Sequence, residues 1–107
     1  MASKAFALNV VENESSYILE ALLAGVKKDL VEISVEDGKL TLSINTPEEA
    51  AAKEYAFQEW APVSGTRTFA LPKDANPEAV KATMAEGVLR LEISKLEEKQ
   101  PKKVEIH

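Results

Sequence analysis

The sequence lacks the residues on which most enzyme and metal chemistry depends. It contains no cysteine, which excludes disulfides, thiolate metal ligands and cysteine nucleophiles. Its single histidine is the last residue, His107, and a terminal imidazole is a poor general base because nothing holds it in position. The sequence also has no glycine-rich phosphate loop, metal-ligand cluster or nucleophile–base pair. We therefore expect no enzyme activity, no cofactor and no bound metal.

Membranes and nucleic acids are equally poor matches. No apolar run approaches the ~20 residues that a membrane-spanning helix needs, and the first four residues open no hydrophobic signal segment. The chain carries 18 acidic against 13 basic side chains, a net charge of −5, whereas nucleic-acid binding needs a clustered basic face. Its 107 residues suffice for one hydrophobic core. These features predict a single-domain cytoplasmic protein that binds neither nucleic acid nor membrane.

What the sequence does contain is a strict alternation of apolar and polar residues. In the clearest runs, 31–35, 40–44 and 89–93, every second residue is Val, Ile or Leu and the residues between are polar. Such a run buries one face and exposes the other, as half-buried antiparallel strands do. Weaker runs of the same kind are Phe6–Val11, Tyr17–Leu23, Arg67–Leu71 and Val80–Met84.

Turn residues separate these runs. Asp37-Gly38 and Glu86-Gly87 each lie between two alternating runs, and glycine there permits a tight hairpin. Pro72–Pro77 reads as a connection that no strand crosses, since proline lacks a backbone donor. The pattern predicts an all-β fold, an antiparallel β-sandwich of about seven or eight short strands.

One segment departs from the strand pattern. Thr46-Pro47-Glu48-Glu49 resembles a helix start and precedes alanines of high helix propensity, so 47–53 reads as a helical turn or a mobile loop. The residues that follow, 54–60, read as an extended stretch.

The last residues form a charged, proline-containing tail. Residues 96–103 read as a solvated linker, which is followed by Val104-Glu105-Ile106. The two β-branched side chains would lie roughly 7 Å apart on an extended segment, a spacing that fills two pockets at an exposed sheet edge.

Several of these blocks resemble the α-crystallin domain of small heat shock proteins. They are LEALLAGVKK (19–28), VEISVEDGKLTL (31–42), RTFALP (67–72), KATMAEGVL (81–89) and VEI (104–106), in the family's order and at its spacing. The chain departs from the family pattern at Ala24, where a proline is usual, at Glu86, where asparagine is usual, and at Gly65, where an aromatic often occurs.

The resemblance implies an immunoglobulin-like sandwich with a strand-exchange loop. Residues 7–95 would form the α-crystallin domain, in which 46–61 provide the loop and the exchanged strand. Residues 96–107 would be the C-terminal tail with its V-x-I motif. Residues 1–6 would be a residual N-terminal arm, or a leader on a trimmed domain, where the family normally has a longer arm.

The resemblance also implies a homodimer. Arg67 matches an arginine near the family's dimer interface, and Glu59 is its candidate partner by resemblance alone. An ordinary surface charge is the alternative role for Arg67. Tyr55, Phe57 and Trp60 fall where bacterial, plant and archaeal members exchange a strand with a second subunit. Packing of the three aromatics in the core of one chain is the alternative.

By the same resemblance, the tail motif inserts into a groove between two edge strands of a neighbouring dimer. Val104 and Ile106 would be the inserted side chains, and the strands would be Leu30–Val35 and Val80–Met84. A plain terminal strand of the same domain, or a frayed end, is the alternative. The expected groove lining is Val31, Ile33, Val35, Val80, Ala82 and Met84.

The function implied is that of an ATP-independent chaperone, a holdase that binds partly unfolded client proteins and prevents their aggregation. The missing phosphate loop agrees with the absence of a nucleotide requirement. The alternative is an adaptor resembling the CS-domain co-chaperones, which would be a monomer without holdase activity of its own. An acidic structural or coat module is a third class, without specific support in the residues.

Overall fold

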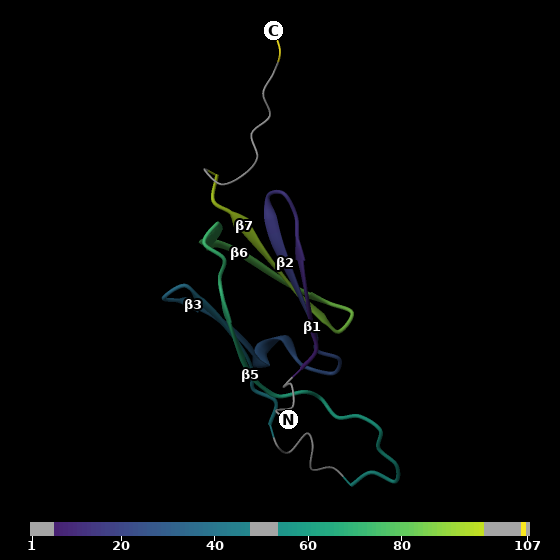
Figure 1. Ribbon diagram of the computed structural model, residues 1–107. Helices are drawn as coiled ribbons and strands as arrows, with labels where there is room; N and C mark the ends of the chain where they lie inside the picture. The colour runs from purple at the N-terminus through teal and green to yellow at the C-terminus, as the bar shows by residue number, and fades with distance from the viewer. Residues whose placement is uncertain (1–5, 48–53, 98–105, 107) are drawn as a thin grey trace, which may run out of the picture.

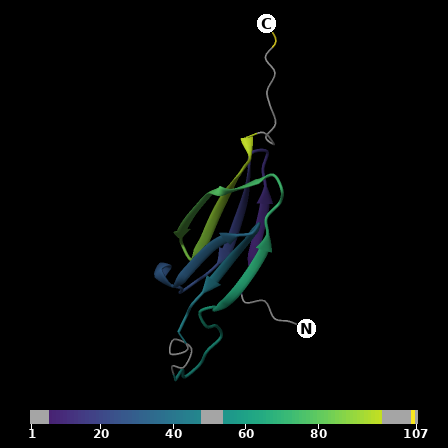
Figure 2. The same cartoon turned by 90° about the vertical axis from the view of Figure 1, so that its left-hand side faces the viewer.

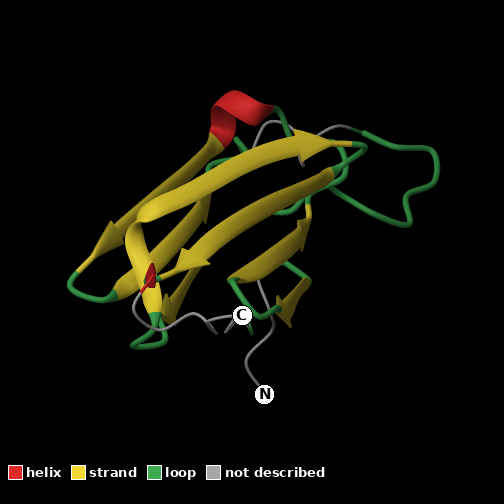
Figure 3. Ribbon diagram, turned by 90° about the horizontal axis from the view of Figure 1, so that it is seen from above, coloured by secondary structure: helices red, strands yellow, loops and turns green. Residues whose placement is uncertain are grey.

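The computed structural model describes residues 6–47, 54–97 and 106, and these residues form seven strands in two antiparallel sheets (Figures 1 and 3). The two sheets face each other as the layers of a sandwich (Figure 2). The predicted all-β, immunoglobulin-like antiparallel sandwich is therefore confirmed. One sheet has the order β1 (Leu8–Glu12), β2 (Ser16–Leu22), β7 (Val88–Lys95), β6 (Ala75–Ala85), and the other β3 (Val31–Glu36), β4 (Lys39–Ile44), β5 (Gly65–Ala70).

The alternation found in the sequence decides which residues enter the core. In the central strand β4, Leu40, Leu42 and Ile44 are at most 2% exposed, whereas the residues between them face outward. The inward residues of β3 alternate in the same way but remain half-buried, because β3 is an edge strand with one neighbour. A short 3-10 helix, η1 (Lys28–Leu30), precedes β3. Within the described residues, no helix has the length and apolar character needed to cross a membrane.

Both predicted hairpins are present. Asp37 and Gly38 have φ of 51° and 72°, and Glu86 and Gly87 have φ of 54° and 77°. Positive φ at both central residues defines the turn whose twist matches the strands on either side. Each turn therefore places one non-glycine residue in the left-handed region.

The prediction that no strand crosses Pro72–Pro77 is wrong. Strand β6 begins at Ala75 and includes Pro77. Its register against β7 shifts between the pairs Ala75–Lys95 and Val80–Ile93, so the intervening residues of β6 have no partner in the ladder. Proline is tolerated in this irregular part of an edge strand because its missing N–H breaks no hydrogen bond.

The extended stretch expected at 54–60 is a loop with bends in this chain, not a strand. A strand needs a partner for its backbone groups, and none is offered to these residues within the described chain. The hydroxyl of Thr46 donates to the carbonyl oxygen of Val63 at 2.7 Å, which joins the two ends of the loop. The helical turn or loop predicted at 47–53 lies outside the described residues except for Pro47.

Candidate interaction surfaces

A groove opens along one side of the sandwich, between the edge strands β3 and β6. Among the residues that the structure describes, each of these strands has a hydrogen-bonded neighbour on one side only, so their outer edges are unpaired there. The groove has a cavity of about 390 Å³. Its lining is mostly apolar and consists of Lys28, Val31, Ile33, Ala82, Thr83, Met84 and Leu89.

Four of the six residues expected to line this groove do so: Val31, Ile33, Ala82 and Met84. The other two, Val35 and Val80, pack half-buried against the core instead. Leu89 also lines the groove but was not expected there, because the alternation along 89–93 assigned it to the core. It belongs to the core cluster as well.

Of the tail motif, only Ile106 belongs to the described residues, and it is not buried in the groove of this chain. Ile106 is 97% exposed. Val104 lies outside the described residues.

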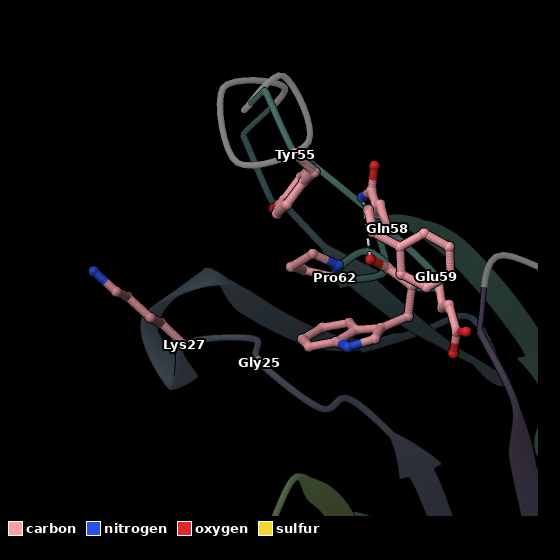
Figure 4. Close-up of a pocket in the computed structure, with 8 residues that line it drawn as sticks. Gly25, Lys27, Tyr55, Gln58, Glu59 and Pro62 are labelled. Carbon is pink, nitrogen blue, oxygen red and sulfur yellow. Dashed lines mark hydrogen bonds between the residues drawn. The ribbon is translucent and has the colours of Figure 1, made fainter.

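The loop over 54–62 presents its aromatic side chains to solvent. Tyr55 is 44% exposed, Phe57 80% and Trp60 65%, so none of the three belongs to the core of this chain. They surround a hollow of about 500 Å³ together with Gly25, Lys27, Gln58, Glu59 and Pro62 (Figure 4).

Trp60 packs against the backbone of the domain at Gly25. A Cβ at Gly25 would lie 3.3 Å from Cη2 and Cζ3 of the indole, so the ring fits only because glycine has none. The same Cβ would lie 3.8 Å from Cγ of Pro62, so Trp60 and Pro62 both approach this glycine closely. Gly25 has φ of 78°, which also favours glycine at this position.

Arg67 is half-buried on β5 and has partners that the sequence did not indicate. Its Nη1 donates to the carbonyl oxygen of Phe6 at 3.1 Å. The guanidinium carbon lies 5.0 Å from the centre of the Phe69 ring and 5.8 Å from that of Phe6, within cation–π range. Within the described part of this chain, Arg67 forms no ion pair with Glu59.

A second exposed edge belongs to β1, which pairs with β2 only. Val10 and Val11 on this strand are 62% and 46% exposed. Unpaired backbone groups beside exposed apolar side chains make such an edge a template for another strand. The sequence pattern did not reveal this, because order in a sheet is not encoded by alternation.

A polar cluster missed by the sequence analysis lies at the end of β7. The ammonium of Lys95 is 2.9 Å from Oε2 of Glu12 and 3.8 Å from Oδ2 of Asp74, and it lies 5.1 Å from the ring centre of Tyr17. The Tyr17 hydroxyl donates to Oδ1 of Asp74 at 2.6 Å. This hydrogen bond is the main reason that the pKa of Tyr17 is raised to about 12; desolvation and the negative charge of Asp74 add to it.

The sequence profile of the Hsp20/alpha crystallin family matches residues 9–107. The chain belongs to this family. Its members are small heat shock proteins, which are chaperones and not enzymes.

Relatives from plants and bacteria agree with this assignment. The chain is 39% identical over 101 residues to an 18.0 kDa class I heat shock protein of Daucus carota, covering 90% of this chain and 62% of the relative. It is 31% identical over 100 residues to small heat shock protein C4 of Rickettsia felis, covering 92% and 61%. The chain thus spans about three fifths of the length of these relatives.

Solved structures of the family share the fold. Heat shock protein 16.0 of Schizosaccharomyces pombe superposes with a TM-score of 0.72 at 26% identity, with 98% of each chain covered. A small heat-shock protein from Xylella fastidiosa gives a TM-score of 0.79 at 24% identity, with 99% of each chain covered. The α-crystallin sandwich is therefore the architecture of this chain.

Proposed function

We propose that the chain is an ATP-independent holdase of the small heat shock protein type. The observation that carries the proposal is the apolar groove between the unpaired edges of β3 and β6, in a member of a chaperone family. Exposed apolar surface beside unpaired strand edges competes with the self-association of partly unfolded chains, which are the expected clients. No nucleotide enters this mechanism, because holding a client requires only mass action.

The proposed organisation has three parts. Residues 7–95 are the α-crystallin domain, with 46–61 as loop and exchanged strand, 1–6 precede it, and 96–107 are the tail. The location in the cytoplasm and the absence of nucleic-acid and membrane partners remain predictions from composition.

The dimer is proposed to form by exchange of residues 54–60. These residues have no strand partner among the described residues of their own chain, and Tyr55 and Phe57 are exposed. The free outer edge of β1, with its exposed valines, is the matching acceptor on a second copy. Pairing would satisfy backbone groups on both segments and bury aromatic side chains, which supply much of the energy of such interfaces. Glu59 then becomes available to the partner's arginine at the position of Arg67.

Dimers are proposed to be linked by the tail. Val104 and Ile106 are separated by one residue, and the groove offers Val31 and Ile33 on β3 and Ala82 and Met84 on β6 as apolar contacts. A tail segment added at this edge gains main-chain hydrogen bonds as well as side-chain burial. The small heat-shock protein from Xylella fastidiosa forms a distinct high-order structure, which supports assembly beyond the dimer.

Mass in solution tests this organisation. Light scattering on the full chain should give an assembly larger than a dimer, and a chain ending at Gln100 should give a dimer. Ile106→Ser should act like the truncation, whereas Glu105→Ser, between the two apolar residues, should leave the mass unchanged. A monomer in both full and truncated chains would contradict the exchange and favour the CS-domain-like adaptor.

Holdase activity is tested separately with a heat-labile client. The chain should suppress light scattering from the aggregating client without ATP, in proportion to the chaperone-to-client ratio. Phe57→Ser should weaken the dimer, and Gln58→Ser, its neighbour in the loop, serves as the control. No suppression by a correctly assembled chain would rule out the holdase and leave the fold and assembly standing.

A further inference from the structure

Lys95 occupies the point at which the tail leaves the domain. It is the last residue of β7, and its own N–H donates to the carbonyl oxygen of Ser15 at 2.8 Å. The N–H of Leu96, the next residue, donates to the carbonyl oxygen of Asp74 at 2.7 Å. The base of the tail is thus tied to the turn between β1 and β2 and to the connection between β5 and β6.

The side chain of Lys95 strengthens this attachment. Although charged, Lys95 is only 8% exposed, and its ammonium lies between the carboxylates of Glu12 and Asp74 and against the ring of Tyr17. Glu12 and Asp74 are partly exposed, with side-chain exposures of 60% and 30%, but the ammonium between them is buried, and a buried charge left without its partners is costly. The ammonium therefore favours staying between the two carboxylates. We call Glu12, Tyr17, Asp74 and Lys95 the Lys95 cluster.

A tail that links two molecules faces competition from its own subunit. A flexibly tethered segment has an effective concentration on the order of millimolar at a site it can reach, far above the micromolar concentration of other molecules. Leu89 lines the groove and Lys95 lies six residues further along β7, which is about 20 Å in an extended strand. The nine residues Leu96 to Val104 are joined by eight steps that span up to about 26 Å, so length alone permits self-docking.

Direction, however, opposes self-docking. The groove residue Leu89 lies near the start of β7, so a tail from the end of β7 must reverse over Lys95–Glu97 to reach its own groove. The end of β7 and the 54–62 loop lie at opposite ends of the sandwich (Figure 1). The two backbone hydrogen bonds and the buried ammonium hold the residues at which the reversal would have to occur.

We propose that the Lys95 cluster is a mount that directs the tail away from the groove of its own subunit and thereby commits it to a neighbouring molecule. The inference rests on the proposed contact between the tail motif and the groove. The cluster members are positioning residues, since they touch neither client nor motif. Lysine is suited to this position because its long apolar stem packs along the domain while its head reaches two carboxylates.

Cross-linking distinguishes docking within a chain from docking between chains. The chain has no native cysteine, so a double variant carries only the two thiols that are introduced. His107→Cys places one beside the motif, and Thr83→Cys places the other at the rim of the groove. A short bis-maleimide then joins the two thiols. Between-chain products migrate as larger species on a denaturing gel, and within-chain products as closed monomers. With the cluster intact, we expect mostly between-chain product.

Lys95→Met should raise the ratio of within-chain to between-chain product by roughly tenfold or more, because the released tail gains the tethering advantage. Glu12→Gln should shift the ratio in the same direction by less. Glu12→Gln also tests the proposed role of the cluster if Lys95→Met does not fold. The Glu12 side chain is largely exposed, so its substitution should leave the fold intact. Lys39→Met, at an exposed lysine of β4, should leave the ratio unchanged.

Two results would overturn the mount, and they are distinguishable. An unchanged ratio in folded Lys95→Met and Glu12→Gln chains would remove the role of the cluster while leaving the tail contact intact. The absence of both products in every variant would contradict the tail contact itself, and the mount with it.

Discussion

Single backbone conformations at the turns explain why certain residues are required. Gly87 has φ of 77°, and a Cβ there would lie 3.3 Å from Cα of Ala24. Its carbonyl also accepts a hydrogen bond from the N–H of Leu23 at 2.7 Å, so the two backbones meet closely. Gly87 is therefore required for two reasons. It permits the positive φ of the turn, and it lets this turn pack closely against the backbone at Leu23 and Ala24.

A pair of glycine substitutions separates these demands. Gly87→Ala and Gly38→Ala should each lose about 1–2 kcal/mol for forcing a side chain into the left-handed region. Gly87→Ala should lose more, because a Cβ at Gly38 would meet nothing within 4 Å whereas one at Gly87 meets Ala24. Urea unfolding of both variants measures the difference. Equal losses would show that the approach to Ala24 relaxes without strain.

Glu86 is strained at the neighbouring position of the same turn. Its φ of 54° is a conformation that asparagine adopts more readily than glutamate, because the short amide can hydrogen-bond locally. We expect Glu86→Asn to raise the free energy of unfolding by roughly 0.5–1 kcal/mol. The midpoint of urea unfolding is the measurement, and a decrease would contradict the turn geometry.

The hydrogen bond from Tyr17 to Asp74 predicts an effect of alkaline pH. The pKa of Tyr17 is raised from 10.0 to about 12 in the folded chain, so between these values the unfolded chain releases a proton that the folded chain keeps. The stabilisation from this group is complete below pH 10 and is lost as the pH rises towards 12. Tyr17→Phe should abolish this part of the pH dependence.

Tyrosinate absorbance measures the shift directly. The chain has two tyrosines, so a Tyr55→Phe chain reports Tyr17 alone. Its titration midpoint should lie near 12 when folded and near 10 in urea. A titration midpoint near 10.0 in the folded chain would contradict the hydrogen bond from Tyr17 to Asp74.

At the scale of elements, the 54–62 loop approaches the connection between β2 and β3 most closely at Gly25, which Trp60 and Pro62 both meet. The indole of Trp60 rests where Gly25 has no side chain. The rest of the loop offers exposed aromatics without a partner in the core. The contact of Trp60 with Gly25 therefore holds one end of the loop, while Tyr55 and Phe57 stay exposed for the proposed strand exchange.

Gly25→Ala should displace the indole, because the new Cβ would lie 3.3 Å from two ring carbons. Trp60 is the only tryptophan, so its fluorescence emission reports this movement as a red shift towards the spectrum of the exposed indole. Gly38→Ala also has positive φ but lies away from Trp60, and its emission should be unchanged. Identical spectra in all three chains would contradict the contact of Trp60 with Gly25.

For the whole molecule, net charge opposes assembly while the proposed contacts are apolar. Each subunit carries −5, so subunits repel one another at low ionic strength. The proposed contact between the tail motif and the groove depends on burial of apolar surface. Screening of charges by salt does not weaken such burial. Addition of salt should therefore increase the assembled fraction. Light scattering between low and physiological ionic strength tests this, and dissociation on adding salt would assign the assembly to ion pairs such as Arg67 with Glu59.

Alternation, turn glycines and family motifs determined the sandwich, its hairpins and most of the groove, because period-2 patterning and positive φ are local properties of the chain. Val31, Ile33, Ala82 and Met84, which the family resemblance named as the lining of a groove for the tail motif, line the cavity between β3 and β6, and binding of the motif there stays a prediction. The absence of cysteine and of paired catalytic residues likewise predicted a binding protein rather than an enzyme.

Only the tertiary structure decided which distant residues meet. Tyr17 and Asp74 are separated by 57 positions, and Lys95 and Glu12 by 83. No local sequence pattern could therefore predict that these four residues form a cluster. The same holds for Arg67 against Phe6, for Trp60 on Gly25, and for Pro77 inside a strand whose register shifts. Periodicity specifies which face of a strand is buried. The order of strands in the sheets specifies which edges stay free and which charged side chains are brought together.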